Sequence, residues 1–235
     1  MKKLLLSWSS GKDSAWALHR LRQQGDYEIA GLLTTVNAAF DRVAMHSTRR
    51  ALVEAQAAAA GLPLTIVPLP WPCSNERYES AMSAACAQAV SNGIEAIAFG
   101  DLFLEDIRQY RIDKLRGTGL EPVFPVWGPP DATRSLAEEM IAGGLRARLV
   151  CVDPKKFPGA DAAAFAGRDF DAALLRDLPP TVDPCGENGE FHTAVYAGPM
   201  FREAIPVETG EIVSRDGFVF ADVKVTEEES SAISV

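Results

Sequence analysis

Apolar runs of strand length alternate with helical apolar periodicity along the first 150 residues. Residues 4–6 form one such run, and after a short polar loop the apolar positions recur at helical spacing from Ala15. The same alternation predicts further strands at 27–36, 63–69, 94–99, 122–126 and 145–152, and helices at 48–60, 74–91, 105–117 and 133–141. Because strands that alternate with helices are typical of a parallel sheet covered by helices, we predict an α/β fold with a doubly wound parallel sheet.

The pattern changes after Pro154. A short helix is predicted at 171–178, and strands at 193–196 and 217–225 could form a small antiparallel element. Residues 226–235 are acidic and polar, as is typical of a frayed tail. We therefore predict a larger domain at 1–150, a smaller C-terminal α+β part at 151–225 and a flexible acidic tail.

The loop between the first strand and the first helix has the properties of a phosphate site. Free N–H groups at a helix start and the helix dipole favour an anion, and Gly11 lets the backbone approach it closely. A lysine adds positive charge and three serines add hydroxyl donors. The predicted binding residues are Ser9, Ser10, Gly11, Lys12, Asp13 and Ser14. The alternative is that this loop only caps the helix, with Ser9 or Ser10 as the N-cap.

Other polar residues follow the ends of neighbouring strands. Thr34 lies near the end of the second strand, and Gly100 and Asp101 follow the fourth. The carboxyl ends of parallel strands meet at one edge, so we expect these residues to join the phosphate loop in one crevice. Asp101 could ligate Mg²⁺ or orient a nucleophile. It could equally be an N-cap beside a surface ion pair between Glu105 and Arg108.

Residues 183–193 form a third polar motif, with the sequence DPCGENGEFHT. Two glutamates, a thiol, an amide and an imidazole lie within one segment that contains two glycines. Loops that carry such groups are often binding loops. The alternative is a solvated turn before a hairpin. We expect Glu187, Glu190 and His192 to take part in the chemistry.

Composition narrows the classes of function. The chain has 235 residues and a net charge of −9, and residues 1–50 carry eight Lys and Arg against four Asp and Glu. Positive charge thus gathers near the phosphate loop while the rest is acidic, which disfavours a broad nucleic-acid surface. The four cysteines form no C-x-x-C pair, and no apolar run is long enough for a membrane span. We expect reduced thiols, a cytoplasmic location and no membrane contact.

Together the three motifs resemble those of the diphthine–ammonia ligase family, specifically its prokaryotic ATP-binding branch within the N-type ATP pyrophosphatases. Residues 9–14 resemble the pyrophosphate loop S-G-G-x-D-S, with Ser10 where the second position is usually glycine. Residues 100–108 resemble the family segment G-D-[IL]-x-x-x-x-x-R. Residues 185–190 resemble its C-G-E-x-G-E signature, after which Phe191 and His192 replace the usual Tyr and Glu.

The resemblance implies an adenine nucleotide alpha hydrolase-like fold of the HUP type and an ATP-dependent ligase. A carboxylate would attack the α-phosphorus of ATP, pyrophosphate would leave, and ammonia would then displace AMP to give an amide. ATP would be held by residues 9–14 with Thr34 and Gly100, and Mg²⁺ by Asp13 and Asp101. The candidate catalytic residues are Asp101, Glu187, Glu190 and His192.

The implied partners are ATP, ammonia and a carboxylate, for which a translation elongation factor is one candidate carrier. A homodimer is a further expectation. Two alternatives stay open. A tRNA-modifying sulfur transferase on the same loop would normally use paired cysteines, and a non-catalytic adenine-nucleotide-binding protein would not need the polar motif at 183–193. His46, after the second strand, could also face the nucleotide.

Overall fold

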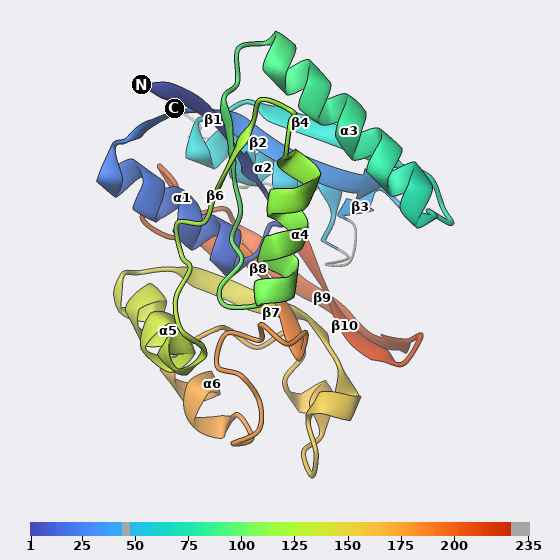
Figure 1. Cartoon of the computed structure of the whole chain (residues 1–235). Helices are drawn as coiled ribbons and strands as arrows, with labels where there is room; N and C mark the ends of the chain where they lie inside the picture. The colour runs from blue at the N-terminus through green and yellow to red at the C-terminus, as the bar shows by residue number, and fades with distance from the viewer. Residues whose placement is uncertain (44–47, 227–235) are drawn as a thin grey trace, which may run out of the picture.

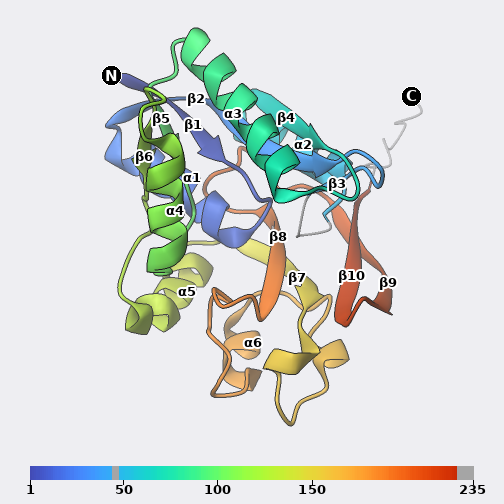
Figure 2. The same cartoon turned by 45° about the vertical axis from the view of Figure 1, so that its right-hand side comes forward.

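Two sheets build the computed structural model, which describes residues 1–43 and 48–226 (Figures 1 and 2). The first, sheet A, contains β1 (Lys2–Ser7), β2 (Tyr27–Asn37), β3 (Arg42–Val43), β4 (Leu64–Leu69), β5 (Ala96–Ala98) and β6 (Glu121–Val123). Strands β4, β2, β1, β5 and β6 lie side by side in that order and are parallel, while the short β3 pairs antiparallel with the end of β2. The predicted parallel sheet is confirmed.

Helices cover both faces of sheet A. They are α1 (Lys12–Gln24), α2 (Arg50–Ala60), α3 (Asn75–Ser91) and α4 (Glu105–Leu115). Successive side chains of a strand point to opposite faces, so Leu4 and Leu6 of β1 pack with α1 and α2, whereas Leu5 packs with α3 and α4. The doubly wound arrangement predicted from the sequence is therefore confirmed.

Sheet B is antiparallel and holds the C-terminal strands. Its order is β8 (Phe191–Ala197), β7 (Arg146–Val152), β10 (Phe218–Val225) and β9 (Val207–Arg215). The strand predicted at 145–152 forms, but the expectation that it extends the parallel sheet is wrong, because β7 pairs with β8 and β10. Its run of buried apolar residues suits a central strand of either sheet, so the pattern alone does not identify its neighbours.

The division of the chain at residue 150 stays a prediction. Because β7 is an inner strand of sheet B, its pairing favours a boundary between β6 and α5 (Thr133–Ala142). Strand β8 begins at Phe191, two residues before the predicted strand, so His192 lies on a strand and not in the preceding loop. The tail beyond Thr226 lies outside the described residues.

Helices α1 and α2 lie between the two sheets, where their side chains join one apolar cluster with residues of both (Figures 1 and 2). Helices α5 and α6 (Ala172–Asp177) pack against sheet B, and short 3₁₀ turns occur at Pro130–Ala132, Pro154–Lys156 and Ala162–Ala164. Across 1–43 and 48–226, none of the helices has the length and apolar character that crossing a bilayer would require. This layering brings the start of α1 against β8.

A charged cluster joins sheet B to the start of α2. Asp222 on β10 accepts hydrogen bonds from Arg49 Nε at 2.9 Å and Arg49 Nη2 at 2.6 Å, and a third from Arg42 at 3.1 Å. The hydrogen bond from Arg49 is the largest cause that lowers the pKa of Asp222 below its ordinary value, and Arg42 acts in the same direction. Bidentate Arg–carboxylate pairs of this kind are stronger than single surface ion pairs.

We predict that Asp222→Asn lowers the free energy of unfolding by about 1–2 kcal/mol at neutral pH, because hydrogen bonds to charged groups are lost. A carboxyl with a lowered folded-state pKa contributes stability only while it is ionised, so the difference should shrink as the pH falls through that pKa. Urea unfolding measures the effect. Glu54→Gln removes an exposed pair with Arg50 and is the control; equal losses in the two variants would contradict the role given to Asp222.

Candidate active site

The loop between β1 and α1 takes an unusual backbone conformation at Ser10. Its φ of +71° lies in the left-handed region that favours glycine, which explains the usual glycine at this position of the resembling motif. The Ser10 hydroxyl is buried and donates to Thr48 Oγ1 at 2.8 Å. The Ser10 carbonyl accepts from Gln56 Nε2 and from the Val195 N–H, each at 3.0 Å. These bonds offset the cost of the left-handed conformation, about 1–2 kcal/mol for a residue other than glycine.

Helix α1 begins without a side-chain cap. Its N-cap is Gly11, and neither Ser9 nor Ser10 caps it, in contrast to the capping alternative. The Lys12 N–H donates to Thr193 Oγ1 of β8 at 3.1 Å, and the Ser14 hydroxyl donates to the Gly11 carbonyl at 3.0 Å. Hydroxyl oxygens of Ser9 and Thr193 thus accept from the Gly11 and Lys12 N–H groups at the start of α1, and an anion bound there would replace these hydroxyls as the acceptor.

Lys12 brings a buried positive charge to the helix start. Its side chain is buried, and Nζ lies 2.8 Å from both carboxylate oxygens of Asp13 and over the rings of Phe170 and Phe191. Burial is the largest single cause and lowers the pKa of Lys12, but the charge and hydrogen bond of Asp13 together with Cys185 and Glu187 outweigh it and the pKa is raised, so the ammonium stays charged. In this structure Lys12 thus contacts the residue predicted as a magnesium ligand.

The segment after β5 fits closely against this helix start. A Cβ atom on Gly100 would lie 2.7 Å from the Ser14 nitrogen and 2.9 Å from the Asp13 carbonyl carbon, so only glycine fits there. Asp101 Oδ2 lies 3.5 Å from Arg111 Nε and has no hydrogen bond although it is buried. Burial raises the pKa of Asp101 despite the opposing charge of Arg111. Asp101 therefore retains an oxygen that can take a ligand.

Arg108, the arginine of the resembling G-D segment, lies elsewhere. Its guanidinium sits 5.3 Å from the ring centroid of Phe124 and 4.6 Å from that of Trp127, and its ion pair with Glu105 spans 3.7 Å. Arg111, one turn further along α4, faces Asp101 instead. The spacing of three residues between Arg108 and Arg111 on α4 is the sequence signal that indicates Arg111.

The 183–193 motif is held by its own hydrogen bonds. Asp183 Oδ1 accepts from the N–H groups of Cys185 and Glu187 at 2.9 and 3.2 Å. Glu190 is buried, and its Oε1 accepts from the Asp183 N–H at 3.0 Å and from the Asn188 side chain at 3.1 Å. Gly186 and Gly189 have φ values of +70° and +80°, which the tight turns require. Through these bonds Glu190 holds the motif together, while its buried Oε2 has no hydrogen-bond partner and its predicted part in the chemistry stays a prediction.

The three motifs meet in one cavity of about 210 Å³, called here the phosphate cavity. Its wall contains residues of the phosphate loop, of the segment after β5, and of the 183–193 motif. Of the predicted site residues, it is lined by Ser9, Gly11, Lys12, Asp13, Ser14, Gly100, Asp101, Glu187 and His192. Ser10, Thr34 and Glu190 do not line it. Gly100 and Asp101 thus meet the phosphate loop in one crevice as expected, whereas Thr34 lies outside this cavity.

The pKa values of Glu187 and His192 are shifted in opposite directions within the phosphate cavity. Glu187 Oε1 accepts a hydrogen bond from the Leu102 N–H at 2.9 Å, and burial followed by the charge of Asp13 raises the pKa of Glu187 to about 7. Burial, aided by the charges of Lys12 and Lys156, lowers the pKa of His192 to about 4. At neutral pH the imidazole is therefore neutral, and Glu187 is close to half ionised.

A larger, more apolar hollow of about 700 Å³ adjoins the phosphate cavity and is called here the apolar groove. It lies between α3 and α4 and shares Ser7, Ser9, Phe99 and Arg111 with the phosphate cavity. Thr34 lines it, and the buried Thr34 Oγ1 has no hydrogen-bond partner. A buried polar atom without a partner is rare and points to a ligand that supplies one.

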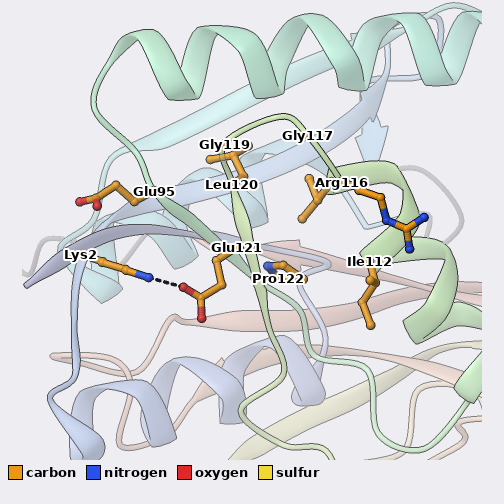
Figure 3. A pocket seen from close by; sticks show the side chains of 10 residues that line it. Lys2, Glu95, Ile112, Arg116, Gly117, Gly119, Leu120, Glu121 and Pro122 are labelled. Atoms are coloured by element: carbon orange, nitrogen blue, oxygen red, sulfur yellow. Dashed lines mark hydrogen bonds and ion pairs between the residues drawn. The ribbon is translucent and has the colours of Figure 1, made fainter.

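A third hollow lies at the opposite edge of sheet A, beside the amino ends of β1 and β6 (Figure 3). It is lined by Lys2, which pairs with Glu121, and by residues of the turn after α4, with none of the predicted site residues. Ligands of open α/β sheets bind beyond the carboxyl ends of the strands, so this hollow is not the candidate site.

No cluster of three or more His, Cys, Asp and Glu with metal-binding geometry occurs among residues 1–43 and 48–226. Mg²⁺ is usually held by one or two carboxylates together with substrate phosphates and water, and Asp13 and Asp101 line the same cavity as the phosphate loop. These residues fit a nucleotide-borne magnesium ion, which stays a prediction. His46 lies outside the described residues.

The structure adds two residues that were not among the predicted site residues. Gln56 on α2 and Thr193, the last residue of the 183–193 motif, contact the phosphate loop directly. Gln56 is the one uncharged polar residue of α2 and lies on the helix face opposite Glu54 and Ala58, among the apolar positions.

Two family models match the chain. The diphthamide synthase N-terminal domain matches residues 1–122, and the diphthamide synthase C-terminal domain matches residues 132–228. Curated relatives include diphthine–ammonia ligases from Bos taurus, 25% identical over 156 residues, Rattus norvegicus, 26% over 158, and Homo sapiens, 25% over 156. Each match covers 64% of this chain and 56% of the relative, so the chain spans about half the length of these relatives.

We predict that Glu187→Gln stabilises the fold at pH 8 by about 2–3 kcal/mol, because a carboxyl whose folded-state pKa is raised from 4.5 to about 7 destabilises the fold once it ionises. The gain should disappear as the pH falls below 4.5, where Glu187 is protonated in both states. Urea unfolding across this range measures the difference. Glu105→Gln, at an exposed position, is the control. A pH-independent difference for Glu187→Gln would show that its carboxyl is not perturbed.

Proposed function

Because this chain belongs to the diphthamide synthase family, we propose that it adenylates a carboxylate with ATP and converts the product to an amide with ammonia. The observation that carries this proposal is the meeting of three motifs in the phosphate cavity, directly beside a groove that suits a nucleoside. The relatives are named diphthine–ammonia ligases. We propose that the acceptor in this protein is a diphthine-like carboxylate.

Adenosine fits the apolar groove and the phosphates fit the phosphate cavity. The groove offers apolar walls and the unpaired Thr34 hydroxyl, which is available to a base or ribose. The cavity offers the start of α1, the Lys12 ammonium and the serine hydroxyls. Because the two hollows share Ser9 and Arg111, one extended ligand can occupy both.

In the first step, a carboxylate oxygen of the acceptor attacks the α-phosphorus. The bond from that phosphorus to the bridging oxygen breaks, and pyrophosphate carries away the negative charge. Lys12 and the N–H groups at the start of α1 are placed to stabilise this charge as it develops. Mg²⁺ bound to the nucleotide would neutralise part of the phosphate charge, with Asp13 and Asp101 as its ligands from the protein.

In the second step, ammonia attacks the acyl carbon and AMP leaves. Ammonium must lose a proton before its nitrogen can attack, so a base near neutral pKa is needed. Glu187, with a pKa of about 7, suits that role better than His192, whose pKa of about 4 makes it a neutral hydrogen-bond acceptor. In this scheme Glu190 contributes by holding the 183–193 motif in its conformation, through its hydrogen bonds from Asp183 and Asn188.

The environment of Cys185 argues against sulfur transfer. Its thiol is buried, donates to the Thr133 carbonyl at 3.3 Å, and has its pKa raised by burial. A sulfur carrier needs an accessible thiolate.

A non-catalytic nucleotide-binding protein is the remaining alternative. A homodimer, a cytoplasmic location and an elongation factor as acceptor stay predictions.

The proposed reaction predicts AMP and pyrophosphate as products, since the attacked bond lies between the α- and β-phosphates. Incubating the protein with ATP, Mg²⁺, ammonium and a panel of carboxylates, followed by ion-exchange chromatography, tests this. Asp13→Ala should abolish product formation, because it removes a predicted magnesium ligand and the partner of Lys12. ADP and phosphate as the products would refute the family reaction for this chain, and ATP binding with no turnover of any acceptor would favour the non-catalytic alternative.

Cys185→Ser separates amide formation from sulfur transfer. The serine hydroxyl can still donate to the Thr133 carbonyl, so we expect the variant to fold and to retain activity within about tenfold of the wild type, a loss of at most ~1.4 kcal/mol. Product formation per folded molecule is the measurement. A folded, ATP-binding Cys185→Ser variant with no activity would make sulfur chemistry the better account.

A further inference from the structure

Gln56 places a fully buried amide between three segments of the candidate site. Its Oε1 accepts from the Trp8 indole N–H at 2.8 Å. Its Nε2 donates to the Ser10 carbonyl at 3.0 Å and to the Val195 carbonyl at 2.7 Å. The amide uses both of its N–H donors and its carbonyl, so its orientation is fixed.

The partners of Gln56 come from both sheets. Trp8 follows β1 of sheet A, Ser10 lies in the phosphate loop, and Val195 is in the middle of β8 of sheet B. The Val195 N–H donates to the same Ser10 carbonyl at 3.0 Å, which closes a small ring of hydrogen bonds between the loop and β8. Strand β8 also carries His192 and Thr193, which line the phosphate cavity.

This ring determines the direction of a backbone donor. The Ser10 carbonyl and the Gly11 N–H belong to one planar trans peptide group, in which they point in opposite directions. Two donors hold the Ser10 carbonyl away from the phosphate cavity, toward α2 and β8. The Gly11 N–H is therefore directed to the other side, where it donates to Ser9 Oγ at 3.3 Å and where both Gly11 and Ser9 line the cavity, so a phosphate oxygen there would take the place of the Ser9 hydroxyl.

We propose that Gln56 is a positioning residue that locks the Ser10–Gly11 peptide so that the Gly11 N–H faces the nucleotide phosphates. The inference rests on the proposed function, because it assigns the donor to ATP. It adds that the lock joins the loop to the strand bearing His192, so the phosphate-binding and acceptor-facing sides keep a fixed spacing. The left-handed Ser10 needs such a lock, since its conformation is not the favoured one for a serine.

The test is Gln56→Glu, which is nearly isosteric. The substituted carboxyl cannot bind both carbonyls as the amide does. If ionised it repels the Ser10 oxygen, and if protonated by its burial it has one O–H to donate in place of two N–H groups, so the ring of hydrogen bonds is broken in either form. Gln88→Glu makes the same chemical change on α3, where the amide bonds only to exposed groups, and is the matched control. Circular dichroism establishes that each variant is folded before binding is measured.

ATP affinity by calorimetry and adenosine affinity by saturation-transfer NMR are the two readouts. We expect Gln56→Glu to weaken ATP about tenfold or more, because a charge-assisted hydrogen bond to phosphate is lost, and to leave adenosine within about twofold. Gln88→Glu should change neither. If Gln56→Glu does not fold, Gln56→Asn, which is uncharged but too short to bridge the partners, carries the same expectation.

The outcomes distinguish the two levels of the account. If wild-type protein binds ATP and Gln56→Glu binds it equally well, the lock is wrong while the proposed function stands. If ATP and adenosine are weakened by the same factor, Gln56 has only a structural role and the inference is overturned. If the wild-type protein binds no ATP, the proposed function fails and the inference fails with it.

Discussion

The carbonyl of Ser10 is the buried polar group on which the arrangement of the site depends. A backbone oxygen between two sheets is costly unless it is hydrogen bonded, and here it receives bonds from a helix side chain and from a strand of the second sheet. The start of α1 therefore cannot move independently of β8. Sheet A supplies the loop, while sheet B fixes where the loop's donors point.

The fixed position of the start of α1 explains why residue 100 is a glycine. Gly100 lies against the first turn of α1 because the helix start is pressed between the segment after β5 and strand β8. The same enclosure removes water from Glu187 and His192, which raises the pKa of Glu187 and lowers that of His192. Burial thus both positions the groups and sets their protonation at neutral pH.

Much of sheet A could be predicted from the sequence because its signals are local. The run at 4–6, the polar loop and the helical periodicity after it need no partner to be recognised. Pairing is not local, so β7 was placed in the wrong sheet: a buried apolar run looks the same in either. Strand β9 was not predicted because this edge strand is largely exposed and polar.

The site residues also divide into those with a local sequence signal and those whose role depends on distant contacts. The motif residues of the phosphate cavity were predicted because each motif carries its chemistry in adjacent positions. Gln56, Thr193 and Arg111 were missed because their roles arise only from contacts between distant segments. Glu190 was predicted from its charge, and only the structure shows that its Oε1 also holds a turn.

A crystal structure with Mg²⁺ and a non-hydrolysable ATP analogue tests the central claim most directly. The account predicts adenosine in the apolar groove beside Thr34, the β- and γ-phosphates against residues 9–14 with the Gly11 N–H as a donor, and the α-phosphate facing Glu187. An analogue bound with its phosphates away from the 9–14 loop, or in the hollow beside Lys2, would contradict it.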